Sequence, residues 1–194
     1  MSADRNQVAA GHPGGDPVAT PSGHDRRVLT VLAAVAVVAL LVDLGTKQLA
    51  LSLLADREPV RLLGGALYLT LIRNSGAAFS LGADYTWVFS LVTLVVIGWI
   101  GWLARSLRSV PWAISLGLVL GGALGNFLDR VFRAPGPFLG HVVDMFSLFD
   151  PRGQIWPIFN IADSALVTGV ILAVGLELTG RQRDGRRLTA RERR

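Results

Sequence analysis

Residues 28–49 read VLTVLAAVAVVALLVDLGTKQL, and this stretch decides the fold class. It is long enough to cross a bilayer as a helix, which takes about 20 residues. Its charged side chains, Asp43 and Lys47, both lie near its far end. A carboxylate close to hydrocarbon costs roughly 3 kcal/mol on insertion scales, so such a residue is normally paired or functional. The stretch therefore predicts a membrane protein with polar chemistry at one end of a helix.

Three more apolar stretches follow, over residues 85–104, 111–131 and 155–178. The composition agrees with a membrane protein: 51% of residues are hydrophobic and 17% are charged, whereas soluble domains are about 25% charged. We therefore expect an all-α membrane protein in which residues 28–178 form a domain of four transmembrane helices. The polar residues 1–27 are expected to form a disordered tail, and residues 179–194 a basic tail.

Two longer loops, residues 50–84 and 132–154, separate the helices on one side. In the first loop, short apolar runs flank Gly64 and Gly65, which indicates a small β-hairpin. In the second, Pro135-Gly136-Pro137 marks a turn. The expected fold is thus a four-helix membrane protein with an extracytoplasmic β-hairpin and a second outer loop.

The distribution of Arg residues predicts the orientation of the chain. Twelve Arg residues lie in the two tails and in the link between the second and third spans, against five in the two longer loops. Basic residues accumulate on the cytoplasmic side, so both termini are expected in the cytoplasm and both longer loops outside. The basic residues that fix this orientation also account for the pI near 10.9. No nucleic-acid partner is therefore expected.

The composition excludes several kinds of chemistry. The chain has no cysteine, which excludes disulfides, thiolate catalysis, Cys-ligated metals and a lipid anchor on this chain. The histidines are His12, His24 and His141, and the first two fall in the polar tail. Because they form no cluster typical of a zinc site, we expect no metal and no other cofactor.

The remaining polar residues fall at the outward ends of the spans. Asn126 and Asp129 lie three residues apart in the third span, and Asn160 and Asp163 have the same spacing in the fourth. This spacing places each pair on one face of a helix. Asn74 lies in the first outer loop. Four helices could thus direct carboxylates and amides to one shallow depth near the outer surface.

Structural roles explain some of these residues. Asp43 and Lys47, four residues apart on one helical face, are expected to form a structural ion pair. Asn74, Asn126 and Asn160 could cap or bridge helices. For Asp129 and Arg130, bracing of the bundle and contact with a substrate remain open alternatives.

Asp144 and Asp163 are harder to explain as structural residues. Two acids that converge at a membrane interface repel each other, and they need a shared proton or a chemical task. With one proton between them, the ionised carboxylate can activate water as a general base, and the protonated one can act as a general acid. This is the chemistry of aspartic proteases.

Five short motifs resemble those of the lipoprotein signal peptidase (signal peptidase II) family. They occur in the family's order along residues 28–178: DLGTK at 43–47, NSGAAF at 74–79, GNFLDR at 125–130, VVDMF at 142–146 and FNIAD at 159–163. Each motif is weak alone, but five in order on a four-span topology are specific. The resemblance implies that Asp144 and Asp163 form the catalytic dyad. It further implies a polar shell around dyad and substrate, made of Asn74, Asn126, Asp129, Arg130 and Asn160.

The resemblance also implies a function. Such an enzyme would cut exported prolipoproteins just before a diacylglyceryl-modified cysteine, in the bacterial cytoplasmic membrane and near its outer face. Its partners would be those substrates and membrane lipid, with no obligatory protein partner. A proton-coupled transporter and a non-enzymatic membrane scaffold are the alternatives. Transporters place acids nearer the midplane, and a scaffold needs no Asn–Asp faces on separate helices.

Overall fold

The computed structural model describes residues 26–76 and 86–188 of the 194-residue chain. Within these ranges there are four long helices: α1 (Arg26–Leu53), α2 (Thr86–Ala104), α3 (Val110–Phe132) and α4 (Ile161–Leu178). Each is long and apolar enough to cross a membrane. The expected four-helix membrane fold is therefore confirmed. The tail predicted to be disordered falls, up to residue 25, outside the described residues.

Helix α3 is the central element of the bundle and contacts the other three helices. In the most apolar stretch of α3, half of the residues are buried, against 22% or less in the same stretch of each other helix. Glycines permit the close approach: a Cβ on Gly121 would collide with the α1 backbone at Ala36, and one on Gly122 would collide with Ala162 in α4. Small residues at such crossings allow backbones to pack directly, so α3 provides the frame that holds α1 and α4.

A three-stranded antiparallel sheet packs at one end of the bundle. Its strands are β1 (Val60–Leu62), β2 (Leu67–Asn74) and β3 (Val142–Leu148), in the order β1-β2-β3. The short 3-10 turn η1 (Leu63–Gly65) joins β1 to β2, which confirms the expected hairpin. The pairing of β2 with β3 places Ile72 opposite Asp144 and Asn74 opposite Val142.

Strand β3 corrects the prediction that residues 132–154 form only a loop. Residues 142–145 are all buried, so the strand lacks the polar–apolar alternation by which half-buried strands are recognised. It is formed through backbone pairing with β2, some 70 residues earlier in the chain, and this pairing leaves no local trace in the sequence.

The start of the fourth span was also predicted wrongly. Helix α4 begins at Ile161 rather than at residue 155. Before it, Phe159 pairs with Phe146 of β3 in an isolated bridge, and Pro157 cannot supply the N–H that a continuous helix would need. Asn160 then caps the helix, because its side chain accepts a hydrogen bond from the Asp163 N–H at 2.9 Å. Helix α1 runs from Arg26 to Leu53 and extends beyond the expected 28–49 at both of its ends.

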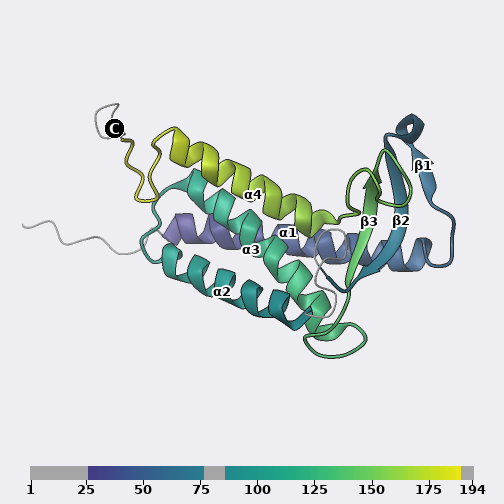
Figure 1. The fold of residues 1–194 in the computed structure, drawn as a ribbon. Helices are drawn as coiled ribbons and strands as arrows, with labels where there is room; N and C mark the ends of the chain where they lie inside the picture. The colour runs from purple at the N-terminus through teal and green to yellow at the C-terminus, as the bar shows by residue number, and fades with distance from the viewer. Residues whose placement is uncertain (1–25, 77–85, 189–194) are drawn as a thin grey trace, which may run out of the picture.

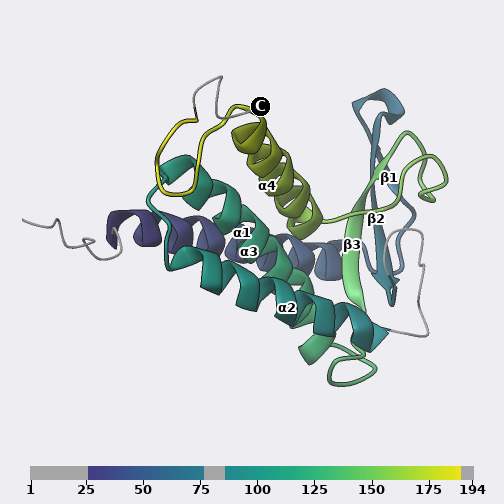
Figure 2. The ribbon, with the colours of Figure 1, turned by 60° about the vertical axis from the view of Figure 1, so that its left-hand side comes forward.

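The described ends of the chain lie together, opposite the sheet. Figure 1 shows the start of α1 and the turn after α4 at one end of the bundle, with the three strands at the other end. Figure 2 shows the same arrangement after a turn of the molecule. The motifs at the outward ends of the spans therefore converge beneath the sheet.

Candidate active site

Asp144 and Asp163 line one cavity of about 460 Å³ at the sheet end of the bundle. Strand β3 carries Asp144, and the first turn of α4 carries Asp163. The cavity is lined mainly by apolar atoms, with a few polar groups that converge on the two acids. Its other polar side chains come from Asn74, Asn126, Arg130 and Ser164.

The Asp144 carboxylate is almost fully buried and is held by two amides. It is 2% exposed. Asn74 Nδ2 donates to its Oδ2 at 3.0 Å, and Asn160 Nδ2 donates to its Oδ1 at 2.7 Å. Burial, followed by the charge of Asp163, raises the pKa of Asp144 to about 7, although both amide hydrogen bonds oppose the shift. At neutral pH, Asp144 can therefore hold or release a proton.

Asp163 has a different environment at the N-terminus of α4. Its Oδ2 accepts the Asn160 backbone N–H at 3.2 Å, which completes a capping box. Its Oδ1 accepts from Asn126 Nδ2 at 2.8 Å. Negative charge is favoured in the first turn of a helix, where free N–H groups and the helix dipole point toward it. The two acids thus share a cavity but differ in what surrounds them.

Two asparagines connect the acids to each other. Asn160 Nδ2 lies within hydrogen-bonding distance of both Asp144 Oδ1 and Asn126 Oδ1, at 2.7 and 3.1 Å. Asn126 in turn donates to Asp163. Asn160 therefore both caps α4 and contacts Asp144, and Asn126 both bridges helices and contacts Asp163. Both asparagines therefore combine a structural role, as a cap or a bridge between helices, with a direct contact to one of the acids.

Beneath the cavity, Asp43, Lys47 and Asp129 form a buried ionic network. Lys47 Nζ lies 2.7 Å from Asp43 Oδ2 and 3.0 Å from Asp129 Oδ2, and it donates to Asn126 Oδ1 at 3.0 Å. Lys47 and Asp43 are 0% exposed. The ion pair expected between Asp43 and Lys47 is present, and the network also includes a second acid and touches an asparagine of the cavity.

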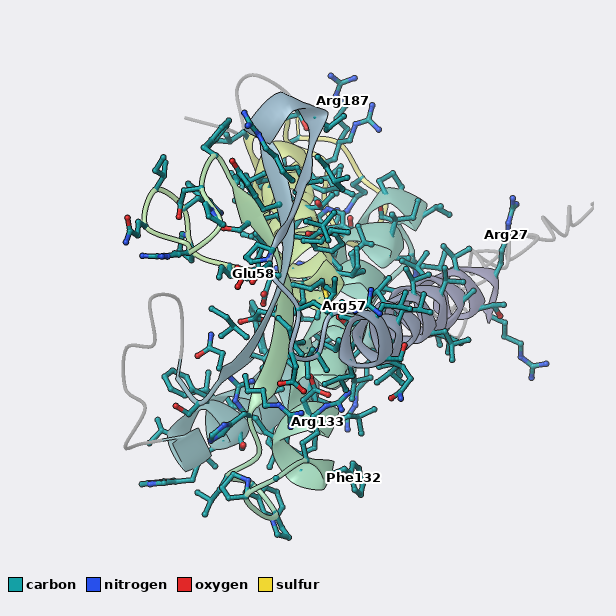
Figure 3. All side chains as sticks on the ribbon, turned by 90° about the vertical axis from the view of Figure 1, so that its right-hand side faces the viewer. Arg27, Arg57, Glu58, Phe132, Arg133 and Arg187 are labelled. Carbon is teal, nitrogen blue, oxygen red and sulfur yellow. The ribbon has the colours of Figure 1, made fainter. Side chains whose placement is uncertain are left out.

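The network fixes the neighbouring backbone as well. Asp43 Oδ1 accepts the Ala162 N–H at 2.9 Å, and Asp129 Oδ2 accepts the Val143 N–H at 3.1 Å. These bonds position the residues next to Asp163 and Asp144. Asp129 also pairs with Arg133, which the sequence analysis did not single out. Arg133 follows the last residue of α3, Phe132, whose side chain projects away from the bundle (Figure 3).

Arg130 lines the cavity and forms no ion pair with its neighbour Asp129. Its guanidinium donates to the carbonyl oxygens of Asn126 and Gly76, both at 3.3 Å, and lies 5.4 Å from the centre of the Phe89 ring. The side chain is buried, and its Nε has no hydrogen-bond partner. Arg130 Nε is therefore a buried donor that stays unsatisfied.

Sequence reasoning missed the segment before α4. Trp156, Pro157, Ile158 and Phe159 all line the cavity, although the sequence analysis assigned them to the fourth span. The spacing of Asn160 and Asp163 is that of a capping box, and this signal could have moved the helix start to its observed place. Gly76 also lines the cavity, while residues 77–79 of the NSGAAF motif lie outside the described residues.

Within residues 26–76 and 86–188, no group of three or more His, Asp or Glu side chains could hold a metal ion. That the site needs no metal or cofactor remains a prediction.

The chain is similar in sequence to a family of known proteins. The family model described as signal peptidase (SPase) II matches residues 35–178. A lipoprotein signal peptidase of Mycobacterium avium is 46% identical over 179 residues, covering 90% of this chain and 96% of the relative. That of Rhodococcus jostii is 47% identical over 175 residues, covering 90% and 85%.

A lipoprotein signal peptidase of Mycolicibacterium smegmatis is 50% identical over 155 residues, or 80% of this chain; the matched region spans 64% of that longer protein. A solved structure titled as a bacterial membrane enzyme superposes with a TM-score of 0.65 at 28% identity, covering 77% of this chain and 88% of the other.

Proposed function

Because the chain belongs to the signal peptidase II family of bacterial membrane enzymes, we propose that it is an aspartic endopeptidase that removes signal peptides from prolipoproteins. Asp144 and Asp163 form its catalytic dyad. The observation that carries this proposal is that the two acids share one cavity and are joined through Asn126 and Asn160.

The surroundings of the two acids suggest their roles. Asp144, whose pKa is raised to about 7, holds the proton at the start of the reaction. Asp163, at the N-terminus of α4, takes the role of general base and accepts a proton from the attacking water. The water oxygen bonds to the scissile carbonyl carbon while Asp144 protonates the carbonyl oxygen.

Collapse of this tetrahedral intermediate completes the cycle. The C–N bond breaks, one hydroxyl proton of the intermediate returns to Asp144, and Asp163 passes its proton to the leaving amine. Both carboxyl groups regain their starting states. No side chain forms a covalent bond to the substrate, which suits a chain without cysteine.

The substrate's position follows from the cavity walls. The proposed substrate is a prolipoprotein whose signal peptide ends before a diacylglyceryl-modified cysteine, and cleavage falls on the N-terminal side of that residue. Trp156 and Ile158 form part of an apolar wall against which lipid chains can pack. Arg130 lines the same cavity, and its guanidinium can donate to a main-chain carbonyl of the substrate.

A cleavage assay on the purified protein with a lipidated prolipoprotein tests the proposal. Asp144→Asn and Asp163→Asn should each abolish cleavage and leave the protein folded, and the two losses should not add in the double variant because acid and base act as a unit. Asp56→Asn, at an exposed loop position, is the matched control and should cleave normally. Near-normal turnover by either dyad variant would remove the assignment.

A further inference from the structure

Two adjoining hollows lie at the end of the bundle opposite the sheet. The first is an apolar groove of about 430 Å³ lined by α2, α3 and α4. The second is a more polar pocket of about 450 Å³ between the end of α2 and the turn after α4. Leu103 and Arg183 line both, so the pocket and the groove are direct neighbours.

The polar pocket presents two arginines without a carboxylate partner. Arg105 and Arg183 line it, and neither forms an ion pair with any residue in the described ranges. The Arg183 guanidinium is placed by the ring of Trp112, whose centre lies 5.8 Å away. The acid in the pocket, Asp184, is already paired with Arg186 at 2.7 Å. Two positive charges therefore remain available to an external anion.

We propose that these two hollows form a binding site for an anionic phospholipid. The phosphate lies between Arg105 and Arg183, whose planar guanidinium groups suit phosphate oxygens, and an acyl chain occupies the apolar groove. Trp99 and Trp102, 55% and 59% exposed, lie near the end of α2 and line the groove and the pocket respectively. Tryptophan is enriched where proteins meet the membrane interface. In the orientation expected from the Arg distribution, the site faces the cytoplasmic leaflet, whose surface is negatively charged.

The charges favour a lipid over the substrate's own signal helix. Signal peptides carry a positively charged N-terminal region, which Arg105 and Arg183 would repel. A helix with its side chains is also about 10 Å wide, whereas an acyl chain is a single row of methylenes. Glu177 lines the groove on α4 and weakens the field of the two arginines, so its removal should improve anion binding.

Native mass spectrometry of the full chain in detergent tests the site. Dioleoyl phosphatidylglycerol should bind in preference to dioleoyl phosphatidylcholine, and inorganic phosphate should not displace it. Arg105→Gln/Arg183→Gln should weaken phosphatidylglycerol binding roughly tenfold or more, since each arginine near an anionic headgroup contributes on the order of 1 kcal/mol. Glu177→Gln should strengthen it. Val174→Trp, which fills the groove, should weaken it without any change of charge.

The matched control is Arg181→Gln/Arg187→Gln, which removes the same charge from the same end of the bundle. Both residues are exposed and line neither hollow, so phosphatidylglycerol binding should persist. Arg105→Gln alone, at an exposed position, serves if the double variant does not fold. Equal binding of the two lipids, displacement by phosphate, or equal losses in both double variants would overturn the proposal. Displacement by a synthetic signal peptide would assign the groove to substrate instead.

Discussion

At the scale of single residues, Asp144 makes stability depend on pH in an unusual direction. Its pKa is raised from 3.8 to about 7, first by burial and then by the charge of Asp163. The folded state therefore prefers the protonated form. The contribution of Asp144 to the free energy of unfolding is full below pH 4 and is lost as the pH rises through 7. The free energy of unfolding changes by on the order of 4 kcal/mol at most.

Asp144→Asn should remove this dependence. The melting temperature of the native protein in detergent should fall between pH 5 and pH 8 by more than that of the variant. The Asp56→Asn control should follow the native protein, since Asp56 is exposed. If native protein and Asp144→Asn lost stability in parallel over this range, Asp144 would not be the group that titrates near 7.

Variants of Arg130 can distinguish a role in substrate binding from a role in holding the helices together. Its guanidinium contacts the carbonyl oxygens of Asn126 and Gly76 and leaves Nε free. Lysine cannot reproduce this planar fork. We expect Arg130→Lys to keep most of the thermal stability but to lower kcat/KM about 10- to 100-fold, because one good hydrogen bond to a charged group contributes roughly 1.5–3 kcal/mol. A variant that melts earlier but cleaves normally per folded molecule would make Arg130 a structural residue.

At the scale of elements, Lys47 joins α1 to α3 and reaches the cavity. It neutralises Asp43 and Asp129 and donates to Asn126, which donates to Asp163. Lys47→Met would leave the buried Asp43 carboxylate without a counter-charge and Asp129 with Arg133 as its remaining cation. Removing one partner of a buried ion pair typically costs about 3–5 kcal/mol. The substitution would also release the Asn126 amide that orients Asp163.

Lys47→Met should therefore lower both the melting temperature and the cleavage rate per folded molecule. Gln48→Met, at the next and exposed position of α1, is the control and should change neither. Replacing Asp43 by Asn in the Lys47→Met protein removes the unpaired charge and should restore part of the stability. Full activity in a destabilised Lys47→Met protein would confine the network to a structural role.

The helices and strands differ in whether the sequence alone predicts them. Helices α2 and α3 and the β1–β2 hairpin carry local signals, namely long apolar runs and a Gly-Gly turn, and they were predicted. Strand β3 was missed because its residues are buried on both faces and its partner is distant in the chain. The contact of Lys47 with Asn126 joins residues 79 positions apart, and neither helical spacing nor any motif indicated it. The position of each acid was predictable, but its hydrogen-bond partners were not.

At the scale of the whole molecule, the fold allows two orientations in the membrane. The start of α1 and the turn after α4 lie at one end of the bundle and the sheet with the cavity at the other (Figure 1). One orientation therefore exposes the cavity outside and both described chain ends inside, and the other reverses both. The distribution of twelve against five Arg residues favours the first.

Because the chain has no cysteine, single introduced cysteines can report the orientation without background. Glu58→Cys lies just before β1, and Ser106→Cys lies in the link between α2 and α3; both positions are exposed. In intact cells, a membrane-impermeant maleimide should label Glu58→Cys and leave Ser106→Cys unlabelled until the membrane is permeabilised. The reverse pattern would place the dyad at the cytoplasmic face, where exported prolipoproteins could not present their cleavage site to it.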